Sequence, residues 1–498
     1  MQITSLYIDD YKLLKQFSIS FRKNVSILIG INGSGKSTII EAIAQIFSDA
    51  ILKEKSKFGF KLTYEIRIEE IVRQSSTWGD VNVEYITVEI SADKKDANLY
   101  YKVYTGKDII EKESNIEEKY GALEKIFPSN IVIYYSGLSD IMKKICEPHD
   151  IKLSVNYRAG RPNIYRPFFY FEPELFDLIL ISLLSYEFGD IPQFLFEKAK
   201  IKGVKSIRII LKKPKWSKSK IDNWWGARGE VKTFLDLLNS KSDNPANLDL
   251  TITKEISNKG NIIIDSTTSG NYLNIYIFIQ RKLFEIREYF NNEKTFFKIL
   301  NTLYIDGLLE KCYFSFIGDN NYFSILSEGE QQILTIKGLT ELVTGENTLF
   351  LFDEPDTFLH PSWQGNFIES LIQFVKSNNE TSSQFLITTH SPQLLGNAYP
   401  AESEVQIMED GEIVKITPKY YGRDISTILY ELMGVERRNK KVAKALSVLF
   451  NLIEEEKLEE AKVEFNTLSE LLGEDDPIIV RAKTQLDYLE ESKNETNK

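Results

Sequence analysis

Residues 30–38 have the sequence Gly30-Ile31-Asn32-Gly33-Ser34-Gly35-Lys36-Ser37-Thr38. The stretch satisfies the pattern G-x-x-x-x-G-K-[ST], whose glycines allow backbone N–H groups to converge on phosphate oxygens. It follows a short apolar run, Val25 to Ile29, and precedes apolar residues at helical spacing that begin at Ile39. A strand, a glycine-rich loop and a helix in this order predict a phosphate-binding loop (P-loop) in an α/β fold.

The P-loop predicts that the chain binds ATP and Mg²⁺. Lys36 would reach the β- and γ-phosphates, and Ser37 would ligate the metal ion. A glycine-rich turn arising by chance is the alternative, and the flanking strand and helix argue against it. The residues predicted to contact the nucleotide within this loop are Gly30, Asn32, Gly33, Ser34, Gly35, Lys36, Ser37 and Thr38.

A second motif is the apolar run Thr348-Leu349-Phe350-Leu351-Phe352, which ends in Asp353-Glu354. Beside a P-loop, Asp353 would hold Mg²⁺ directly or through water, and Glu354 would polarise the water that attacks the γ-phosphate. An acidic pair after a strand is common, and a solvated strand end is the alternative for the motif taken alone. The P-loop favours the catalytic interpretation.

A third motif, Leu326-Ser327-Glu328-Gly329-Glu330-Gln331-Gln332, precedes a helical run. Ser327 and Glu330 match a capping box, so the motif is explained by a well-capped helix alone. The same helix start is also suited to bind a γ-phosphate delivered by another subunit. Its position one predicted helix before the Asp353 strand favours this second interpretation.

A fourth motif, Thr388-Thr389-His390-Ser391-Pro392, ends another apolar strand. His390 there could hydrogen-bond a γ-phosphate and report its presence. A lone histidine at a strand end is more often structural. The order of the four motifs favours the functional interpretation.

The four motifs in this order resemble the head of ABC-type ATPases. Transport members usually have LSGGQ and DEPT-x-x-LD, whereas Asp353 to Pro361 gives DEP…LHP, which resembles the OLD-like and SMC-like ATPases of DNA repair and phage defence. The resemblance covers residues 1–395. It implies that Ser327 and Gly329 contact the γ-phosphate of the opposite protomer, that Asp356 lies in the D-loop, and that His390 is the switch histidine.

A narrower resemblance joins the chain to the PtuA family, the ATPases of the Septu anti-phage system, and a similar ATPase accompanies some retrons. It is carried by Lys213-Pro214-Lys215-Trp216, Trp224-Trp225-Gly226 and the segment from Tyr421-Gly422-Arg423-Asp424 to Gly434. It implies an ATPase that assembles into oligomers and controls an HNH nuclease partner of the PtuB type. The Q-loop glutamine is not assigned, and Gln74 is one candidate.

Charge limits how the chain could contact nucleic acid. With 61 basic and 72 acidic residues, its net charge is −11, which excludes a globally basic coat. Ten basic residues and no acidic ones lie between Lys198 and Lys220, with Trp216 among them and Trp224-Trp225 close behind. The run could contact a nucleic-acid backbone, with the tryptophans stacking on bases. A solvated hairpin or strand face is the alternative.

Several classes of protein are excluded. Cys146 and Cys312 cannot form a disulfide framework, and two cysteines with three histidines lack the spacing of a zinc finger. The N-terminus does not resemble a secretory signal, and the longest apolar run, Leu175 to Leu184, is too short to span a membrane. We therefore expect a cytoplasmic protein without a membrane partner. Once His360 and His390 are placed, His149 alone cannot build an HNH centre, so any nuclease would act in trans.

The expected fold is α/β, an ABC-type P-loop ATPase head with an inserted mixed α/β domain and a helical C-terminal appendage. From Glu454 onward, 14 acidic and 6 basic residues give a net charge of −8. A solvated helical hairpin and a partner-docking arm both explain this tail. The expected boundaries are 1–149 for the N-terminal lobe with the P-loop, 150–300 for the insertion, 301–425 for the C-terminal lobe and 426–498 for the appendage.

The leading hypothesis is an ATP-binding and ATP-hydrolysing regulatory subunit of an anti-phage defence complex. It would form a homo-oligomer built on head-to-tail ATPase dimers and control an HNH nuclease, PtuB-like, that acts on DNA. The alternative is a stand-alone DNA-repair ATPase that resembles RecF. The nucleotide-binding subunit of a transporter is disfavoured by the motif variants and the large insertion.

Overall fold

A computed structural model describes residues 1–70, 82–105, 108–137, 139–161, 167–240, 262–266, 271–278, 280–318, 326–377, 382–415, 418–433 and 438–496. Gln74, the candidate Q-loop residue, lies outside these ranges. The chain divides into two units, Met1–Arg423 and Asp424–Lys498.

A seven-stranded sheet forms the centre of the first unit, in the order β17-β16-β3-β15-β14-β8-β9. Every neighbouring pair from β16 to β9 is parallel. All residues of β3 and β14 are buried, as expected for the continuous apolar runs of parallel strands. The carboxyl ends of these strands therefore meet at one edge of the sheet. The strands are β3 (Val25–Ile29), β8 (Asn130–Tyr135), β9 (Phe168–Tyr170), β14 (Asn347–Asp353), β15 (Ser382–Thr388), β16 (Ser403–Glu409) and β17 (Glu412–Ile413).

Alternate residues of the buried strands pack against helices on opposite faces of this sheet. Leu349 and Leu351 of β14 belong to the core that contains α1 (Lys36–Leu52). Phe350 of β14 instead packs against Phe374 of α10 (Pro361–Ser377), with ring centroids 6.1 Å apart. The predicted α/β head, with a parallel sheet between helices, is confirmed.

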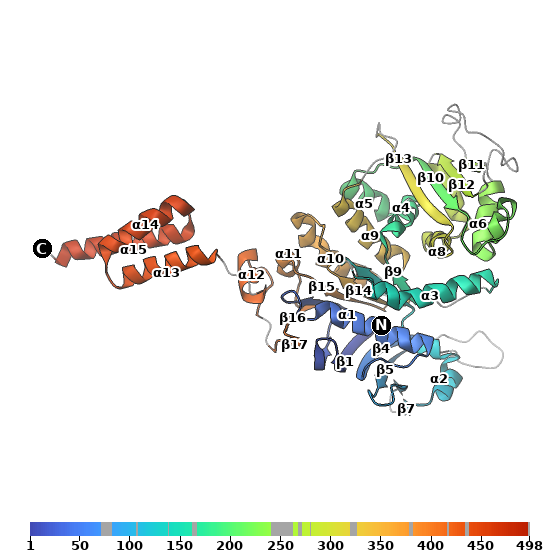
Figure 1. Ribbon diagram of the computed structural model, residues 1–498, viewed down its shortest axis with the longest axis horizontal. Helices are drawn as coiled ribbons and strands as arrows, with labels where there is room; N and C mark the ends of the chain where they lie inside the picture. Colours follow the sequence, from blue (N-terminus) through green and yellow to red (C-terminus); the bar gives the residue numbers. More distant parts are fainter. Residues whose placement is uncertain are drawn as a thin grey trace. The chain divides into compact units, whose positions relative to one another are not determined.

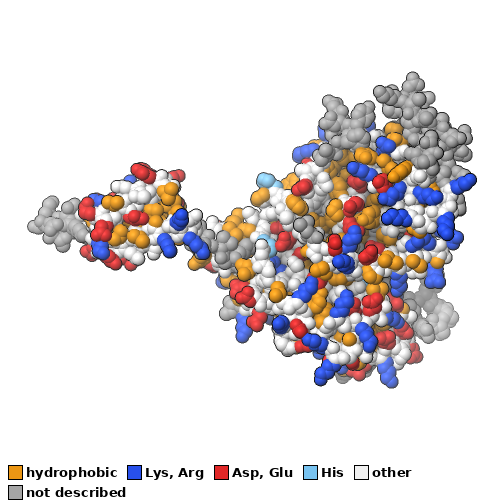
Figure 2. All heavy atoms as spheres, viewed as in Figure 1, with side chains coloured by type: hydrophobic (Ala, Val, Ile, Leu, Met, Phe, Trp, Pro, Cys, Tyr) orange, Lys and Arg blue, Asp and Glu red, His pale blue; other side chains and the backbone are white. Residues whose placement is uncertain are grey.

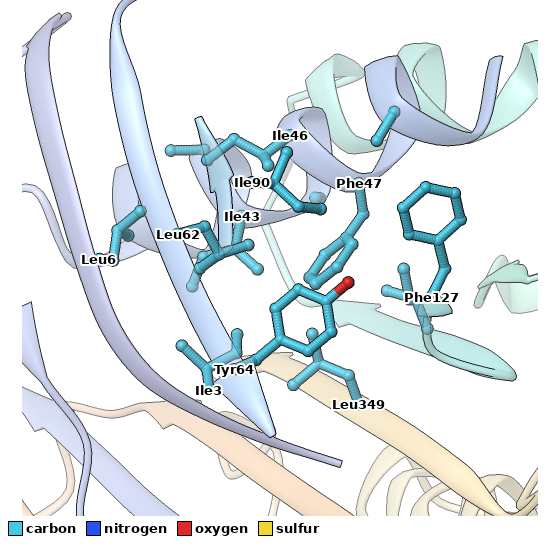
Figure 3. Close-up of a cluster of buried hydrophobic side chains, with 14 of the residues drawn as sticks. Ile3, Leu6, Ile43, Ile46, Phe47, Leu62, Tyr64, Ile90, Phe127 and Leu349 are labelled. Atoms are coloured by element: carbon cyan, nitrogen blue, oxygen red, sulfur yellow. The ribbon is translucent and has the colours of Figure 1, made fainter. Parts of the chain in front are cut away.

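A six-stranded antiparallel sheet covers α1 from its other side, in the order β2-β1-β4-β5-β6-β7 (Figure 1). Figure 3 shows Phe47 of α1 beside Tyr64 of β4, with Leu349 of β14 close by. The Tyr64 hydroxyl donates to the Ile126 carbonyl at 2.8 Å, which satisfies the one polar atom of this ring in an apolar core. The strands are β1 (Gln2–Tyr11), β2 (Leu14–Ser20), β4 (Phe60–Glu70), β5 (Asn82–Ala92), β6 (Leu99–Thr105) and β7 (Asp108–Ile110), and α2 (Glu113–Tyr120) follows.

The insertion contains a four-stranded antiparallel sheet in the order β11-β12-β10-β13. Its helix α4 (Phe176–Leu184) packs against α9 (Glu328–Leu342), the helix that begins at the third motif. The strands are β10 (Val204–Lys212), β11 (Ile262–Ser266), β12 (Tyr272–Phe278) and β13 (Leu309–Phe316). The helices are α3 (Ile141–Arg158), which leads into it, α5 (Asp190–Ala199), α6 (Gly229–Ser240), α7 (Gln280–Tyr289) and α8 (Glu293–Ile305).

The expected boundary at 425/426 lies close to the division at Arg423 between the two units, and the other expected domain boundaries stay predictions. The expected boundary at 149/150 falls inside α3, and the one at 300/301 falls inside α8. Strand β9, expected in the insertion, pairs with β8 of the main sheet, and β13, expected in the C-terminal lobe, belongs to the insertion sheet. Pairing between strands that are distant in the sequence decides which sheet each strand joins. Nothing in the local sequence marks this pairing.

The second unit begins with α12 (Ile425–Met433) and continues with α13 (Lys440–Glu454), α14 (Leu458–Leu472) and α15 (Pro477–Thr496). Helices α13, α14 and α15 share a core built around Leu449, Ala461 and Ala482. Arg438 donates to both carboxylate oxygens of Asp476 at 2.8 Å, and this contact lowers the pKa of Asp476. Among the residues that the structure describes, no helix is both long and apolar enough to cross a membrane.

Candidate nucleotide-binding site

The P-loop joins β3 to α1, as the sequence predicts. Gly30 has φ 154°, and a Cβ at this position would lie 2.1 Å from the Met408 carbonyl oxygen of β16. A larger residue therefore cannot occupy position 30 without displacing the neighbouring strand. The Gly411 N–H donates to the Ser34 carbonyl at 3.1 Å, so the turn after β16 supports the loop. Asn32 and Gly33 lie on the loop, Gly35 caps α1, and Thr38 lies in the first turn of this helix.

Lys36 is the first residue of α1, and its ammonium group lies over the loop. Its Nζ donates to the Gly30 carbonyl at 2.9 Å and to the Ile31 carbonyl at 3.1 Å. Burial lowers the pKa of Lys36, and the charges of Glu354 and Asp353 oppose this effect. The hydroxyl of Ser34 is buried without a hydrogen-bond partner among the described residues. A phosphate oxygen in the loop would satisfy a buried donor of this kind.

Asp353 ends β14 and lies opposite Thr388 of β15 and Tyr135 of β8 in the sheet register. Its carboxylate accepts hydrogen bonds from the hydroxyls of Thr388 and Ser37. Burial raises the pKa of Asp353, and these two hydrogen bonds oppose the shift. The structure thus brings together the Ser37 hydroxyl and the Asp353 carboxylate, which are the hard oxygen donors that Mg²⁺ prefers.

Glu354 follows directly and faces His390, with 3.0 Å between Glu354 Oε1 and His390 Nε2. Its backbone has φ 51°, which is uncommon for a residue with a side chain, and its N–H donates to the Thr388 carbonyl at 3.1 Å. The hydrogen bond from His390 lowers the pKa of Glu354. The carboxylate is therefore charged at neutral pH and held at the same edge of the sheet as the P-loop.

Asp356 lies buried beyond this pair, where it accepts a hydrogen bond from the Thr389 hydroxyl at 2.9 Å. Burial raises the pKa of Asp356 to about 6. Its other carboxylate oxygen, Oδ1, has no hydrogen-bond partner among the described residues. Asp356 is thus connected to the strand end that carries His390, and not to the P-loop.

The third motif forms the capping box that the sequence predicts. The Glu330 N–H donates to Ser327 Oγ at 3.3 Å, and the Ser327 N–H donates to Glu330 Oε2 at 2.8 Å. A Cβ on Gly329 would lie 2.9 Å from the Phe358 carbonyl, so the start of α9 packs tightly on the loop after β14. Within the described part of the chain, the hydrogen bonds of Ser327 stay in this turn and do not reach the P-loop.

Sequence reasoning missed several residues that hold these segments in place. The Gln332 side chain accepts from the Phe358 N–H at 2.9 Å and donates to the Tyr134 hydroxyl at 3.0 Å, so it links α9, the loop after β14 and β8. Met408 closes the P-loop from β16. Gln332 lies within the third motif and Thr388 within the fourth, so the sequence offered a signal for these two residues. Met408 lies in a strand without a motif, and no sequence signal marks it.

The basic run from Lys198 to Lys220 keeps most of its lysines exposed, so its contact with nucleic acid stays a prediction, but the tryptophans behind it are buried. Trp224 and Trp225 are 7% and 1% exposed, so they belong to the core and cannot stack on bases, and that part of the prediction is wrong. Lys212 pairs with Glu310 at 2.6 Å, and Arg208 donates to the Asn274 side chain at 3.0 Å. The run is divided among α5, the connection to β10, β10 itself and the loop that follows.

The remaining cysteines and histidines are structural. Cys146 and Cys312 are buried, and no disulfide joins them in the described part of the chain. His149 lies 2.9 Å from the Ser48 hydroxyl and stacks on Phe168. No group of three or more His, Cys, Asp or Glu residues suited to a metal ion occurs in the described ranges. A P-loop metal does not need such a group, because nucleotide phosphates and water supply most of its ligands.

Comparison with known proteins places this site in a family. A family model described as an AAA ATPase domain matches residues 1–395 of the 498. The chain belongs to the AAA ATPase domain family. It is an ATP-hydrolysing enzyme, and the matched residues include the P-loop, Asp353, Glu354 and His390.

Two related proteins are ATPases by name. The Retron Ec83 probable ATPase of Escherichia coli is 24% identical over 533 residues, an alignment that covers 98% of this ATPase and 87% of the relative. The Retron Vc95 probable ATPase of Vibrio cholerae serotype O1 biovar El Tor is 23% identical, covering 79% of this chain and 71% of the relative.

Among solved structures, the SMC head domain from Thermotoga maritima has a TM-score of 0.31 at 14% identity and covers 84% of this chain and 100% of its own. The recombination mediator RecF bound to an ATP analogue has a TM-score of 0.33 at 13% identity, covering 83% of this chain and 98% of its own. These scores are low, and the fold assignment depends on the sheet order and the family match.

Proposed function

We propose that this ATPase is the regulatory subunit of an anti-phage defence complex, and that its ATP cycle controls a partner nuclease of the HNH type that acts on DNA. The similarity to the Retron Ec83 probable ATPase supports this proposal, because it extends over 98% of the chain and so includes the insertion and the second unit. Similarity confined to the ATPase head would be weaker support, because many P-loop proteins share such a head. Similarity through the accessory parts favours a shared biological role.

The convergence of three strand ends carries the catalytic part of the proposal. The P-loop after β3, Asp353-Glu354 after β14 and His390 after β15 lie at one edge of the sheet. Lys36 binds the β- and γ-phosphates, while Glu354 orients and polarises the attacking water. Mg²⁺, held by Ser37 and Asp353, would neutralise charge that develops on the phosphates. His390 positions Glu354 through their 3.0 Å contact and lies where a γ-phosphate contact is expected.

The third motif, at the start of α9, supports a site shared between two copies of the chain. Ser327 and Gly329 lie at the start of α9, whose capping box is complete, yet no hydrogen bond among the described residues joins them to the P-loop of the same chain. A helix start with backbone N–H groups suits a phosphate of a second protomer. A head-to-tail dimer would complete both sites in this way.

Mixing two inactive variants tests the shared site. Lys36→Ala removes the P-loop lysine, and Ser327→Arg places a bulky cation at the helix start. Either variant alone should be inactive, but an equal mixture should recover ATPase activity, because a mixed dimer contains one intact composite site. The measurement is phosphate release across mixing ratios. Absence of recovery at every ratio would show that each chain hydrolyses ATP alone.

A stand-alone DNA-repair ATPase that resembles RecF is the second candidate function, and the missing nuclease motif is compatible with both candidates. Affinity purification of the full chain from its native host separates the two. Co-purification of an HNH protein supports the defence complex. ATPase activity that is stimulated by DNA, without any such partner, supports the repair function instead.

The lysines after β10 provide a further test of contact with DNA. Replacing Lys212, Lys213 and Lys215 with glutamate should weaken DNA binding by the whole complex for all sequences and reduce its salt dependence. Basal ATPase activity should change little, because these residues lie outside the P-loop edge. A matched variant with Lys55, Lys95 and Lys119 changed to glutamate should bind DNA normally, since these exposed lysines lie outside the insertion. Equal salt slopes for both variants and the wild type would assign DNA recognition to the partner.

A further inference from the structure

We propose that the insertion contains a phosphate-binding pocket, separate from the P-loop, whose ligand is a nucleotide, either free or part of a DNA strand. A cavity of about 580 Å³ lies between the end of α3, the loop after β10 and the start of α6. The proposal does not depend on the nuclease partner. The cavity is lined by Arg158, Trp216, Ser217, Lys218, Ser219, Trp225, Gly226, Ala227, Arg228 and Lys232.

The charge of this pocket is strongly positive. Arg158, Lys218, Arg228 and Lys232 line it, and none of its described lining residues is acidic. Among the described residues, no carboxylate pairs with Lys218 or Lys232, which are both exposed. Figure 2 shows Lys and Arg side chains gathered on the face of the insertion near α6. In a chain of net charge −11, four converging cations create a local field that attracts an anion.

Arg158 is held in a fixed position at one side of the cavity. Its guanidinium donates to the Ser154 carbonyl at 3.2 Å and to the Ser154 hydroxyl at 2.9 Å, and it lies 5.3 Å from the centre of the Trp216 ring. The nearest acidic group is Asp306, whose Oδ1 is 3.9 Å from Arg158 Nε and also accepts from Ser154. Arg228 donates to the Arg158 carbonyl at 3.2 Å, which brings the two arginines together.

The opposite wall is formed by an unusual backbone turn. Trp224, Trp225 and Gly226 have φ values of 45°, 54° and 88°, so three consecutive residues are left-handed. Such a conformation is unfavourable for residues with side chains and persists only where the surroundings enforce it. Here both tryptophan side chains are buried, and Trp224 Nε1 donates to Asp236 at 2.6 Å. The turn directs the chain so that Lys218 and Arg228 face the same cavity.

The chemistry of the lining fits a phosphate. Two guanidinium groups and two ammonium groups supply forked and single donors, and the hydroxyls of Ser217 and Ser219 add further polar atoms. A volume of about 580 Å³ exceeds that of one phosphate and accommodates a nucleotide. Of the ten basic residues between Lys198 and Lys220, Lys218 alone lines the cavity. The structure therefore assembles a cation cluster that the linear run does not contain.

The test uses the full chain with Lys36→Ala, so that the P-loop does not contribute. Arg228→Gln with Lys232→Gln removes two pocket charges, and Lys202→Gln with Lys205→Gln removes two exposed charges outside the cavity. Two probes are titrated, AMP by calorimetry and a fluorescent ten-nucleotide DNA strand by anisotropy. The pocket variant should bind at least one probe about tenfold more weakly or worse, because each lost charge-assisted contact costs roughly this factor.

Each outcome of the two titrations either supports or overturns the proposed phosphate-binding pocket. Weaker AMP binding in the pocket variant, with the control variant unchanged, supports a free-nucleotide ligand, and a loss confined to the strand supports nucleic acid. A charge-conserving variant, Arg228→Lys with Lys232→Arg, should bind as the parent does, which separates loss of charge from loss of folding. The proposal is overturned if the Lys36→Ala parent binds neither probe, if the pocket variant binds both as the parent does, or if the control loses as much.

Discussion

Replacing Lys36 with alanine should abolish detectable ATP binding and, with it, ATPase activity and the protection against phage that the proposed function entails. The ammonium group lies within the P-loop, where it donates to the Gly30 and Ile31 carbonyls at 2.9 and 3.1 Å. No other lysine or arginine of the described chain donates to these carbonyls. Losing a charged donor to the β- and γ-phosphates should weaken binding about a hundredfold or more. Calorimetric titration with ATP measures the effect.

A second variant, Lys36→Arg, tests whether the shape of the side chain matters as well as its charge. Charge is retained, but a planar guanidinium does not replace a compact ammonium in a loop closed by the Gly30 and Ile31 carbonyls, so binding should still fail. Lys55→Ala, at an exposed lysine after α1, should bind ATP normally. Thermal unfolding should show that all three variants are folded. Wild-type affinity in Lys36→Ala would remove the P-loop assignment altogether.

The strands that meet at the candidate site could be predicted from the sequence, because each contributing element carries its own local signal. A buried parallel strand is a continuous apolar run, and its carboxyl end is marked by the residues that follow, as at Gly30, Asp353 and Thr388. Parallel strands must then bring these ends to one edge. The structure adds the 3.0 Å contact between the Glu354 and His390 side chains.

Features that depend on pairing between distant segments could not be predicted in this way. Met408 lies against Gly30 because β16 pairs with β3, and the two strands are separated by most of the chain. The tryptophans at 224 and 225 follow a basic run, so stacking on bases was a reasonable hypothesis. Their burial depends on α6 and on the left-handed turn, which local composition does not encode.

The cations of the insertion illustrate the same limit. Counting charges along the sequence selects Lys198 to Lys220, yet Lys212 is paired with Glu310 on β13. The pocket draws Arg158 from α3 and Lys232 from α6 instead. A positively charged surface patch is formed by residues that are neighbours in space. A run of charges along the sequence therefore predicts such a patch poorly, unless the run forms a single exposed helix or strand.

Replacing Glu354 with glutamine should leave ATP binding intact and slow hydrolysis by at least about a hundredfold, the usual scale for loss of a general base. The side chain keeps its shape but loses the negative charge that polarises water. The hydrogen bond from His390 lowers the pKa of Glu354, so the wild-type carboxylate remains charged well below neutral pH. The ratio of wild-type to variant rates should therefore stay constant between about pH 6 and pH 8. Single-turnover phosphate release measures both rates.

Two comparisons make this experiment decisive. ATP affinity of Glu354→Gln, measured by calorimetry, should match that of the wild type, because Lys36 and the P-loop amides are untouched. The variant should also accumulate as an ATP-dependent dimer in size-exclusion chromatography, since the proposed shared site would close but could not hydrolyse its nucleotide. Glu369→Gln, a substitution of the same kind on the exposed side of α10, is the matched control and should hydrolyse ATP normally. Hydrolysis at the wild-type rate in Glu354→Gln would show that another group activates the water.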